Sequence, residues 1–419
     1  MPEKLQSPKG THDVLPADAA PRLAVERVAR KVLEGAGYRR VETPTFEATE
    51  LFARGVGAST DIVQKEMFTF EDGGGRSITL RPEGTAPVAR AYLQHGMHKL
   101  PQPVKLWYLS SFFRNERAQA GRFRQFWQIG AEAIGSAEPV VDAESIVLLH
   151  TVLTELGVQD LHLRLGSLGT PQTRADYREK LVAHLRANED RLSEEVRGRI
   201  DLNPLRAFDA DHPGTREVMR TAPLLMDELA AEDAEHFAEV RAHLDAAGVP
   251  YDLDPTLVRG LDYYARTVFE FTSGALGAQS AVGGGGRYDG LIEQLGGPAT
   301  PGTGWAAGIE RILLSAGHRP EPEPVLDLYV AIDGEQRDLR VTGFQLAQRA
   351  RAAGLNAQLE LAGRSMKGQL KQAARSGARY VAVVRSEEIG LKDMESGEQH
   401  PVTGGVDAVV HDVLRGGTL

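Results

Sequence analysis

The ten residues from Arg259 to Val268 read Arg-Gly-Leu-Asp-Tyr-Tyr-Ala-Arg-Thr-Val, and they lie among residues that predict β-strands. Successive strand residues point to opposite faces of a sheet, so Arg259 and Tyr263 would point to the face opposite that of Tyr264. Buried charges are tolerated only when they are paired or when a ligand supplies the partner. The run therefore predicts one wall of a polar small-molecule site; the alternative is a solvated edge strand.

The length and composition predict a globular protein with several domains. The 419 residues exceed what one ordinary core holds, so we expect two or three domains. No apolar run approaches membrane-spanning length, and residues 1–10 lack the apolar core of a signal peptide, so we expect a soluble, cytoplasmic protein without membrane partners. The absence of cysteine excludes disulfides, thiolate metal sites and a cysteine nucleophile. The net charge of −10 argues against coating nucleic acid by bulk attraction alone.

Strand-like segments dominate the first part of the chain and resume after residue 250, which favours an antiparallel sheet flanked by helices. Between these two parts, charged helical segments predict an inserted helical module. Residues 317–324 contain three prolines and predict a stiff, extended linker. The predicted division is a first part of the sheet domain at 1–170, a helical insertion at 171–250, a second part of the sheet domain at 251–320, and a separate domain at 325–419.

The last domain alternates strands with helices, which predicts βαβ units and a mainly parallel sheet. The predicted strands cover residues 325–332, 356–361, 379–384 and 406–411, and the predicted helices cover 336–353 and 365–376. In the second helix Lys367, Lys371 and Arg375 are four residues apart and form a basic stripe. A solvated helix face is the ordinary explanation, and phosphate contacts with RNA are the alternative.

A second chemistry-bearing block, residues 113–132, consists of two predicted strands around a loop rich in arginine, glutamine and glycine. The basic loop suits a polyphosphate, because arginine binds phosphate oxygens in a bidentate fork and remains charged. Phe126 could stack on a flat base. Gln128 and Glu132 share one face of the second strand and could hold a polar ligand. The alternative is a surface hairpin with ordinary salt bridges.

Three further blocks carry polar groups or glycines at turns. In residues 79–85, proline and glycine fix a turn that carries Glu83, which would pair with an ammonium group. In residues 302–311, glycines precede a helix that presents Arg311, and this arginine needs an anion. The four glycines at 283–286 predict close backbone packing around a pocket rather than a dinucleotide site. Together the blocks predict ATP and an amino acid as ligands.

These blocks resemble the motifs of class II aminoacyl-tRNA synthetases. The helix leading to Pro44 resembles motif 1, residues 113–116 with Arg122 and Phe126 resemble motif 2, and residues 302–311 resemble motif 3. Residues 257–264 and 285–291 are similar to the two signatures of the histidyl-tRNA synthetase family, and the similarity covers essentially the whole chain. The resemblance implies an α+β catalytic domain with an antiparallel six-stranded sheet, a helical insertion, a homodimer joined through motif 1, and an anticodon-binding α/β domain at the C-terminal end.

The resemblance implies a histidine–tRNA ligase, which forms histidyl-adenylate and pyrophosphate from L-histidine and ATP and then transfers histidine to the 3′ end of its tRNA. Its partners would be L-histidine, ATP and histidine tRNA, with Mg2+ held by the ATP phosphates and no prosthetic group. No side-chain nucleophile is needed, because the adenylate itself is the activated acyl group.

The resemblance also assigns roles to individual residues. Arg259 and Arg114 would be catalytic, because they would stabilise the negative charge that develops at the α-phosphorus. The residues around histidine would be Glu83, Gly84, Thr85, Gln128, Glu132, Tyr263, Tyr264 and Tyr288. The residues around ATP would be Arg114, Glu116, Arg122, Phe126 and Arg311. The candidate tRNA contacts are Arg117, Gln119, Lys367 and Lys371.

Selection of histidine would depend on the pairing of buried polar groups. Glu83 would hold the amino group, and Glu132 with tyrosine hydroxyls would match the imidazole nitrogens, so an apolar amino acid would leave these groups unpaired. Because Arg259 and Tyr264 lie on opposite faces of an ideal strand, the chain must twist, bulge or turn at Gly260 to bring both into one pocket.

Two other functions fit parts of this pattern. One is a non-catalytic regulatory subunit of the ATP phosphoribosyltransferase that begins histidine biosynthesis, which is built from the same catalytic fold. Such paralogues lack the C-terminal domain and commonly lose catalytic residues, whereas residues 325–419, Arg259 and Arg311 are present here. The other is a different class II synthetase, which the paired tyrosine signatures disfavour.

Overall fold

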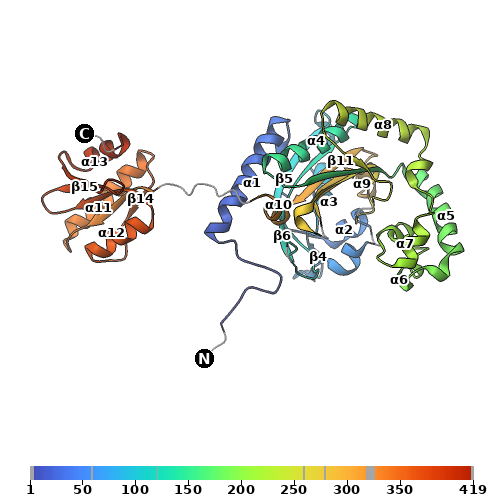
Figure 1. Cartoon of the computed structure of the whole chain (residues 1–419), viewed down its shortest axis with the longest axis horizontal. Helices are drawn as coiled ribbons and strands as arrows, with labels where there is room; N and C mark the ends of the chain where they lie inside the picture. The colour runs from blue at the N-terminus through green and yellow to red at the C-terminus, as the bar shows by residue number, and fades with distance from the viewer. Residues whose placement is uncertain are drawn as a thin grey trace. The chain divides into compact units, whose positions relative to one another are not determined.

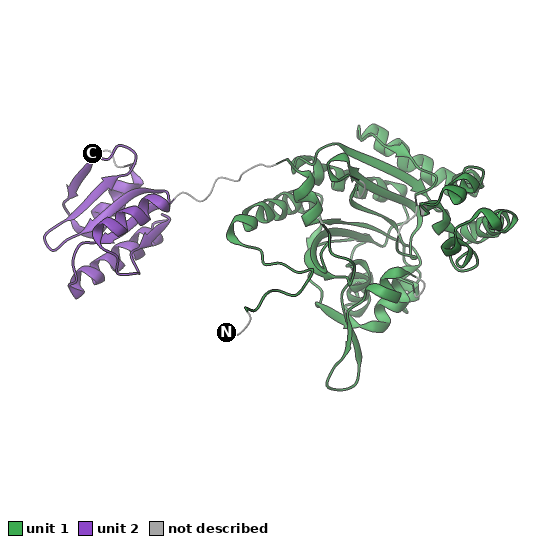
Figure 2. Ribbon diagram, turned by 60° about the horizontal axis from the view of Figure 1, so that its bottom comes forward, with its two compact units in different colours: residues 1–319 green, residues 320–419 purple. Residues whose placement is uncertain are grey.

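The computed structural model describes residues 4–57, 60–119, 121–257, 260–277, 280–317 and 326–416. The chain forms two compact units, unit 1 at Met1–Arg319 and unit 2 at Pro320–Leu419 (Figures 1 and 2). Arg259 and most of the predicted proline-rich linker lie outside the described residues. Within those residues, no helix has both the length and the apolar character that crossing a membrane requires.

Unit 1 is built around one eight-stranded sheet with the strand order β1-β5-β6-β11-β10-β9-β7-β8. The strands are β1 (Arg39–Arg40), β5 (Val104–Phe113), β6 (Gln125–Ile134), β11 (Gly302–Gly308), β10 (Ala281–Arg287), β9 (Ala265–Ser273), β7 (Leu161–Ser167) and β8 (Asp252–Leu253). The six strands from β5 to β7 pair antiparallel, and β1 and β8 add short parallel pairs at the two edges. The predicted antiparallel six-stranded sheet is therefore confirmed, with a two-residue strand added at each edge.

One face of this sheet is covered by helices that form the main apolar core. These helices are α1 (Pro16–Gly35), α4 (Pro139–Glu155), α8 (Ala231–Ala246) and α10 (Ile309–Ser315). Helix α4 contacts the sheet, α1 and α8, and it has no single apolar stripe because it is buried on most sides. On β6, Ile129 and Ala131 belong to this core, whereas Gln128 and Glu132 point to the opposite face.

The opposite face carries a second apolar cluster, to which α3 (Thr85–Gln94) and α9 (Leu291–Gln294) contribute. Beyond it lie α2 (Thr49–Gly55), the π-helical turn η1 (Ile62–Glu66), the 3-10 helix η2 (Met97–Lys99), and a three-stranded sheet of β2 (Phe46–Ala48), β4 (Ser77–Leu80) and β3 (Thr69–Glu71). This face therefore combines polar side chains from the sheet with the N-terminus of α3.

A helical module between β7 and α8 has an apolar cluster of its own. It consists of α5 (Pro171–Ala187), η3 (Glu189–Arg191), α6 (Glu194–Arg197), η4 (Pro204–Asp209), α7 (Pro213–Met219) and η5 (Leu225–Glu228). Its cluster includes Tyr177, Leu181 and Leu185 from α5, whereas α8 contributes Phe237 and Val240 to the main core instead. Helix α8 is thus the element through which the chain returns from the module to the sheet.

Unit 2 contains a five-stranded sheet with the order β13-β12-β14-β15-β16. Its elements are β12 (Leu326–Ile332), α11 (Arg337–Ala352), β13 (Ala357–Leu359), α12 (Met366–Arg375), β14 (Ala378–Val384), β15 (Ile389–Asp393), β16 (Gln399–Val402) and α13 (Gly405–Leu414). The first three strands in this order are parallel, as predicted, and the antiparallel β15–β16 hairpin was not predicted.

The predicted strand at residues 406–411 is wrong, because these residues form part of α13. Val406, Val409, Val410 and Val413 pack on the unit 2 core, and their spacing of three, one and three residues is that of a helix. The preference of valine for strands favoured the wrong interpretation, and the helical period of the apolar residues outweighs it.

The predicted strand across Arg259–Tyr264 is also wrong for the part that the structure describes. Strand β9 begins at Ala265, and residues 260–264 form a turn in which the Asp262 N–H donates to the Val56 carbonyl at 3.2 Å. Tyr263 and Tyr264 bury their rings in the same apolar cluster, which successive residues of a regular strand cannot do. The predicted turn near Gly260 is present in residues 260–264, and the predicted place of Arg259 in the pocket lies outside the described residues.

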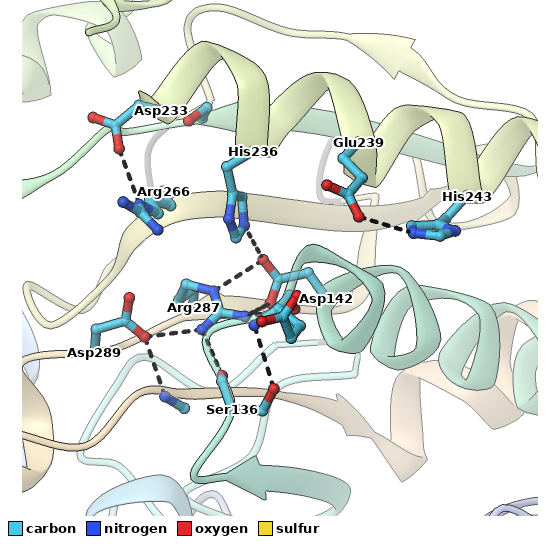
Figure 3. Close-up of polar contacts among 12 residues, drawn as sticks. Ser136, Asp142, Asp233, His236, Glu239, His243, Arg266, Arg287 and Asp289 are labelled. Carbon is cyan, nitrogen blue, oxygen red and sulfur yellow. Dashed lines mark hydrogen bonds and ion pairs between the residues drawn. The ribbon is translucent and has the colours of Figure 1, made fainter. Parts of the chain in front are cut away.

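A buried ion pair joins the end of β10 to α4 (Figure 3). The side chains of Arg287 and Asp142 are both fully buried, with Nη2 2.8 Å from Oδ1 and Nε donating to Oδ2 at 3.0 Å. The remaining N–H groups of Arg287 donate to the carbonyl oxygens of Ser136 and Glu138 and to Asp289 Oδ1. A buried charge needs this degree of pairing to be stable.

Replacement of this arginine by an apolar residue should destabilise unit 1 strongly. We expect Arg287→Met to lower the free energy of unfolding by about 3–5 kcal/mol, because the Asp142 carboxylate would remain buried without its cation. Urea denaturation followed by tryptophan fluorescence measures this, since all three tryptophans of the chain lie in unit 1. Lys31→Gln, which breaks the exposed Lys31–Glu155 pair in the same unit, should have little effect. Equal effects of the two variants would contradict the prediction.

Candidate active site

A cavity of about 340 Å3 opens on the face of the sheet that α3 borders. Its walls come from the start of α3, strands β5, β6, β9, β10 and β11, the hairpin loop between β5 and β6, the turn at 260–264, and α10. The lining residues that the sequence predicted are Glu83, Gly84, Thr85, Arg114, Glu116, Arg122, Phe126, Gln128, Tyr263, Tyr264 and Arg311. Glu132 and Tyr288 lie directly behind them, hydrogen-bonded to each other.

Glu83 lies just before the N-terminus of α3. Its carboxylate accepts hydrogen bonds from the backbone N–H groups of Thr85 and Ala86 at 2.8 and 2.9 Å, which the helix cannot satisfy internally. The Tyr263 hydroxyl donates to the same carboxylate at 3.4 Å. Burial raises the pKa of Glu83, so a cationic ligand group at this position would stabilise the charged form.

Glu132 on β6 is the most deeply buried carboxyl of the site. It accepts hydrogen bonds at 2.7 Å from the Thr85 hydroxyl and at 2.7 Å from the Tyr288 hydroxyl. Burial raises the pKa of Glu132 to about 8. A carboxyl with this pKa gains most from a ligand that donates a hydrogen bond or carries positive charge.

Three tyrosine rings surround this end of the cavity. The ring centroids of Tyr263 and Tyr264 are 4.8 Å apart, and those of Tyr263 and Tyr288 are 5.9 Å apart in an edge arrangement. All three side chains are buried. Their rings and hydroxyls form walls suited to a small, flat, polar ring.

Two glycines allow the sheet to approach these side chains closely. A Cβ atom on Gly304 would lie 1.8 Å from Glu132 Oε2, and one on Gly285 would lie 2.0 Å from the Gly304 carbonyl oxygen. No side chain fits at either position without moving the neighbouring strand. The close backbone packing predicted for residues 283–286 is thus confirmed.

The other end of the cavity is cationic. Arg114 donates from Nε to the Pro82 carbonyl at 2.9 Å, and its guanidinium lies 5.4 Å from the centre of the Phe126 ring. Arg122 is paired with Glu116 at 3.1 Å. Burial and the nearby positive charge of Arg122 lower the pKa of Arg311, which indicates crowded positive charge. An anionic ligand relieves such crowding.

The remaining predicted residues differ in their surroundings. Gln128 lines the cavity, and its Oε1 is buried without a hydrogen-bond donor from the described part of the chain. Arg117 and Gln119 are exposed in the hairpin loop, and the Gln119 backbone pairs with that of Arg122. In unit 2, the predicted tRNA contacts Lys367 and Lys371 are both exposed on α12. Arg259 lies outside the described residues.

Three polar residues of the cavity lining, Tyr108, Glu270 and Glu310, were not predicted from the sequence. Tyr108 lies opposite Gly130 on the β5–β6 pair, and Glu270 lies between Phe269 and Phe271 of the main core. Strand alternation alone would have placed both on the cavity face. Glu310 accepts hydrogen bonds from Arg22 at 2.8 Å and from the backbone N–H of Trp127 at 3.1 Å, contacts that only the tertiary fold creates.

The arrangement joins two kinds of binding chemistry in one cavity. Buried carboxyls and tyrosine hydroxyls at one end suit an ammonium group and a small polar ring, and arginines beside an aromatic ring at the other end suit a polyphosphate with a flat base. A ligand carboxylate and a phosphorus atom brought together between these ends would react among fixed cations.

Comparisons with known proteins agree with this chemistry. A family model described as histidyl-tRNA synthetase matches residues 10–312. A relative named histidine–tRNA ligase from Rubrobacter xylanophilus is 48% identical over 413 residues, covering 95% of this chain and 96% of the relative. The crystal structure of apo S. aureus histidyl-tRNA synthetase is 36% identical, with a TM-score of 0.80 and coverage of 97% of this chain and 99% of that one.

A structure titled as an ATP phosphoribosyltransferase regulatory subunit/histidyl-tRNA synthetase from Bacillus halodurans is similar at 23% identity, with a TM-score of 0.66 and coverage of 91% of this chain and 99% of that one. At this identity the likeness concerns the fold alone. It therefore does not favour the regulatory alternative.

The raised pKa of Glu132 predicts a dependence of stability on pH. The neutral carboxyl stabilises the fold fully below its ordinary pKa of 4.5, and this stabilisation is lost as the pH rises through about 8. We expect wild type to lose on the order of 4 kcal/mol relative to Glu132→Gln between pH 4.5 and pH 8. Thermal unfolding at several pH values measures this. If the stability of wild type and of Glu132→Gln changed equally with pH, the raised pKa of Glu132 would be contradicted.

Proposed function

Because the chain belongs to the histidyl-tRNA synthetase family, we propose that the cavity of unit 1 is the site at which L-histidine reacts with ATP. The protein is a histidine–tRNA ligase, a class II aminoacyl-tRNA synthetase that uses L-histidine, ATP and histidine tRNA. One observation carries the assignment of the site. Carboxyls with tyrosines at one end and arginines at the other line a single cavity.

Histidine would occupy the carboxyl end of this cavity. Glu83, held by the N-terminus of α3, and Thr85 would bind the amino group. The imidazole would lie between Glu132 and the tyrosines Tyr264 and Tyr288, donating an N–H to the buried carboxyl. Glu132 already accepts from the hydroxyls of Thr85 and Tyr288, and the imidazole N–H would add a further donor. An apolar amino acid would bring no such donor into this buried polar site, and its binding would be disfavoured.

ATP would occupy the arginine end. Arg114 would bind the α-phosphate, since its hydrogen bond to Pro82 holds the guanidinium at the cavity wall. Phe126 would stack on the adenine, which Glu116 would also contact. Arg311 would bind the terminal phosphates, with Arg122 contributing positive charge beside it.

The first reaction would be attack of a histidine carboxylate oxygen on the α-phosphorus. The new bond joins that oxygen to phosphorus, the bond to the β-phosphate oxygen breaks, and pyrophosphate leaves. Two anions approach each other in this step, so fixed cations lower the barrier. Arg114 would supply one such cation, and Arg259 remains a second candidate. A terminal ribose hydroxyl of the tRNA then attacks the acyl carbon, and AMP leaves.

Mg2+ would accompany ATP by binding its β- and γ-phosphates. The described residues contain no group of three acidic or histidine side chains that could hold a metal ion. Phosphate oxygens and water would supply most of its ligands, as is common for this ion.

We assign the remaining parts by resemblance to the family. Residues 325–419 would bind the anticodon end of the tRNA, with Lys367 and Lys371 as candidate phosphate contacts, and Arg117 with Gln119 would approach the acceptor end. The protein would be a cytoplasmic homodimer joined through motif 1. The partly exposed Phe46 and Phe70 of the three-stranded sheet are apolar surface of a kind that a second subunit could cover.

Histidine-dependent exchange of pyrophosphate into ATP tests the proposed reaction and separates it from the regulatory alternative. We expect exchange with L-histidine and none with phenylalanine, because the latter cannot pair with Glu132. A protein that binds histidine but catalyses no exchange would be a regulatory subunit, and this result would reject the proposal.

Single substitutions at the two ends should separate binding from catalysis. Arg114→Ala should lower kcat for exchange about 100-fold or more, because one fixed donor to the transition state is lost. Glu83→Gln should instead raise the KM for histidine about tenfold, because the amino group loses its counter-charge. Steady-state kinetics with each substrate varied measures both. The assignment of the two ends fails if both variants change the same parameter equally.

A further inference from the structure

Two arginines adjoin the tyrosines of the histidine site in the sequence. Arg266 follows Tyr264 by two residues on β9, and Arg287 directly precedes Tyr288 at the end of β10. Both arginines are held through one face of α8, the helix by which the chain returns from the helical module (Figure 3). The two contacts involve Asp233 and, three residues later, His236.

The first contact holds a residue in an unusual backbone conformation. Arg266 has a φ of 49°, in the left-handed region that residues other than glycine rarely adopt. Its Nε donates to Asp233 Oδ1 at 2.9 Å, and Glu232 pairs with its terminal nitrogen. The neighbouring backbone is held as well, since Arg174 of α5 donates to the Tyr264 carbonyl at 2.6 Å.

Asp233 is itself fixed by the start of the helical module. Its Oδ2 accepts hydrogen bonds from the Thr170 N–H at 2.8 Å and from the Thr173 hydroxyl at 2.9 Å, and its side chain is 1% exposed. This one carboxylate therefore joins the first turn of α5, the first turn of α8 and the strand that follows the tyrosine pair.

The second contact reaches Tyr288 through the buried ion pair. His236 Nε2 lies 2.9 Å from Asp142 Oδ2, so an imidazole N–H donates to the carboxylate that binds Arg287. Both His236 and Asp142 are buried. Arg287 fixes the end of β10, and the next residue, Tyr288, donates to Glu132.

We propose that Asp233 and His236 are positioning residues for histidine recognition, which fix the segments carrying Tyr264 and Tyr288 from one face of α8. The proposal rests on the proposed function of the cavity. Neither residue lines that cavity, so each acts through another: Asp233 through Arg266, and His236 through Asp142 and Arg287. A change at either residue should therefore alter the binding of histidine more than that of ATP.

Substitutions of His236 test the second contact in the full-length enzyme. His236→Leu removes the donor and should raise the KM for histidine about tenfold in pyrophosphate exchange, with the KM for ATP changed less than twofold. His236→Gln places an N–H near the position of Nε2 and should restore the KM for histidine to within threefold of wild type. An unchanged KM for histidine in His236→Leu, or an equal rise for both substrates, would overturn the proposal.

A double-mutant comparison tests the path through Tyr288. In a Tyr288→Phe background the link to Glu132 is already lost, so His236→Leu should raise the KM for histidine less than twofold further. If the double variant raised the KM for histidine by the product of the two single effects, the proposed path through Tyr288 would be overturned. If His236→Leu does not fold, His236→Asn, whose shorter side chain does not reach Asp142, replaces it against the same His236→Gln control. Absence of histidine-dependent exchange in wild type would reject the proposed function itself.

Substitution of Arg266 tests the first contact without adding backbone strain. Glycine adopts a φ of 49° readily, so Arg266→Gly removes the ion pair while keeping the chain path accessible. We expect the KM for histidine to rise about tenfold and the KM for ATP to stay within twofold. Glu239→Gln is the matched control on the same helix, since it removes the exposed Glu239–His243 pair (Figure 3) and should change neither constant. An unchanged KM for histidine in Arg266→Gly would overturn this part of the proposal.

Discussion

The architecture of the site depends on the buried ion pair between Arg287 and Asp142. Every N–H group of the guanidinium has an acceptor, and Asp289, one of these acceptors, also accepts from the Gly302 N–H at the start of β11. Burial alone would raise the pKa of Asp142, but hydrogen bonding from His236 and the charge of Arg287 hold that pKa below its usual value. The carboxylate is thus charged at neutral pH, and the pair with its hydrogen bonds joins α4, β10 and β11 at one point.

Differences in charge environment divide the cavity into two ends. Glu132 is buried among hydroxyl donors, and burial raises its pKa, whereas the arginines at the other end have aromatic, carbonyl and carboxylate neighbours that hold them at the wall. In the proposed function, histidine would occupy one end and ATP the other, and their reacting groups would meet between them. Specificity and catalysis would therefore rest on different residues of the same cavity.

Local pattern predicted much of the fold and the polar character of the cavity walls, because strand alternation and turn chemistry act over a few residues. The full set of cavity residues came from the resemblance to the family. The helix at 406–411 was predicted as a strand, although its valines have helical spacing. Strand alternation, if applied to β5 and β9 as well, would also have predicted Tyr108 and Glu270 as cavity residues. The sequence could not predict that Arg287 contacts Asp142, 145 residues away, or that Asp233 contacts Arg266. No local pattern indicates which distant segments of a chain meet.

A crystal structure of the protein with L-histidine and a non-hydrolysable ATP analogue bound would test the division of the cavity most directly. We expect the imidazole to lie within about 3.2 Å of the Glu132 carboxyl and the α-phosphate to contact Arg114. An imidazole bound away from Glu132, or an α-phosphate without contact to Arg114, would contradict the central assignment of the two ends of the cavity.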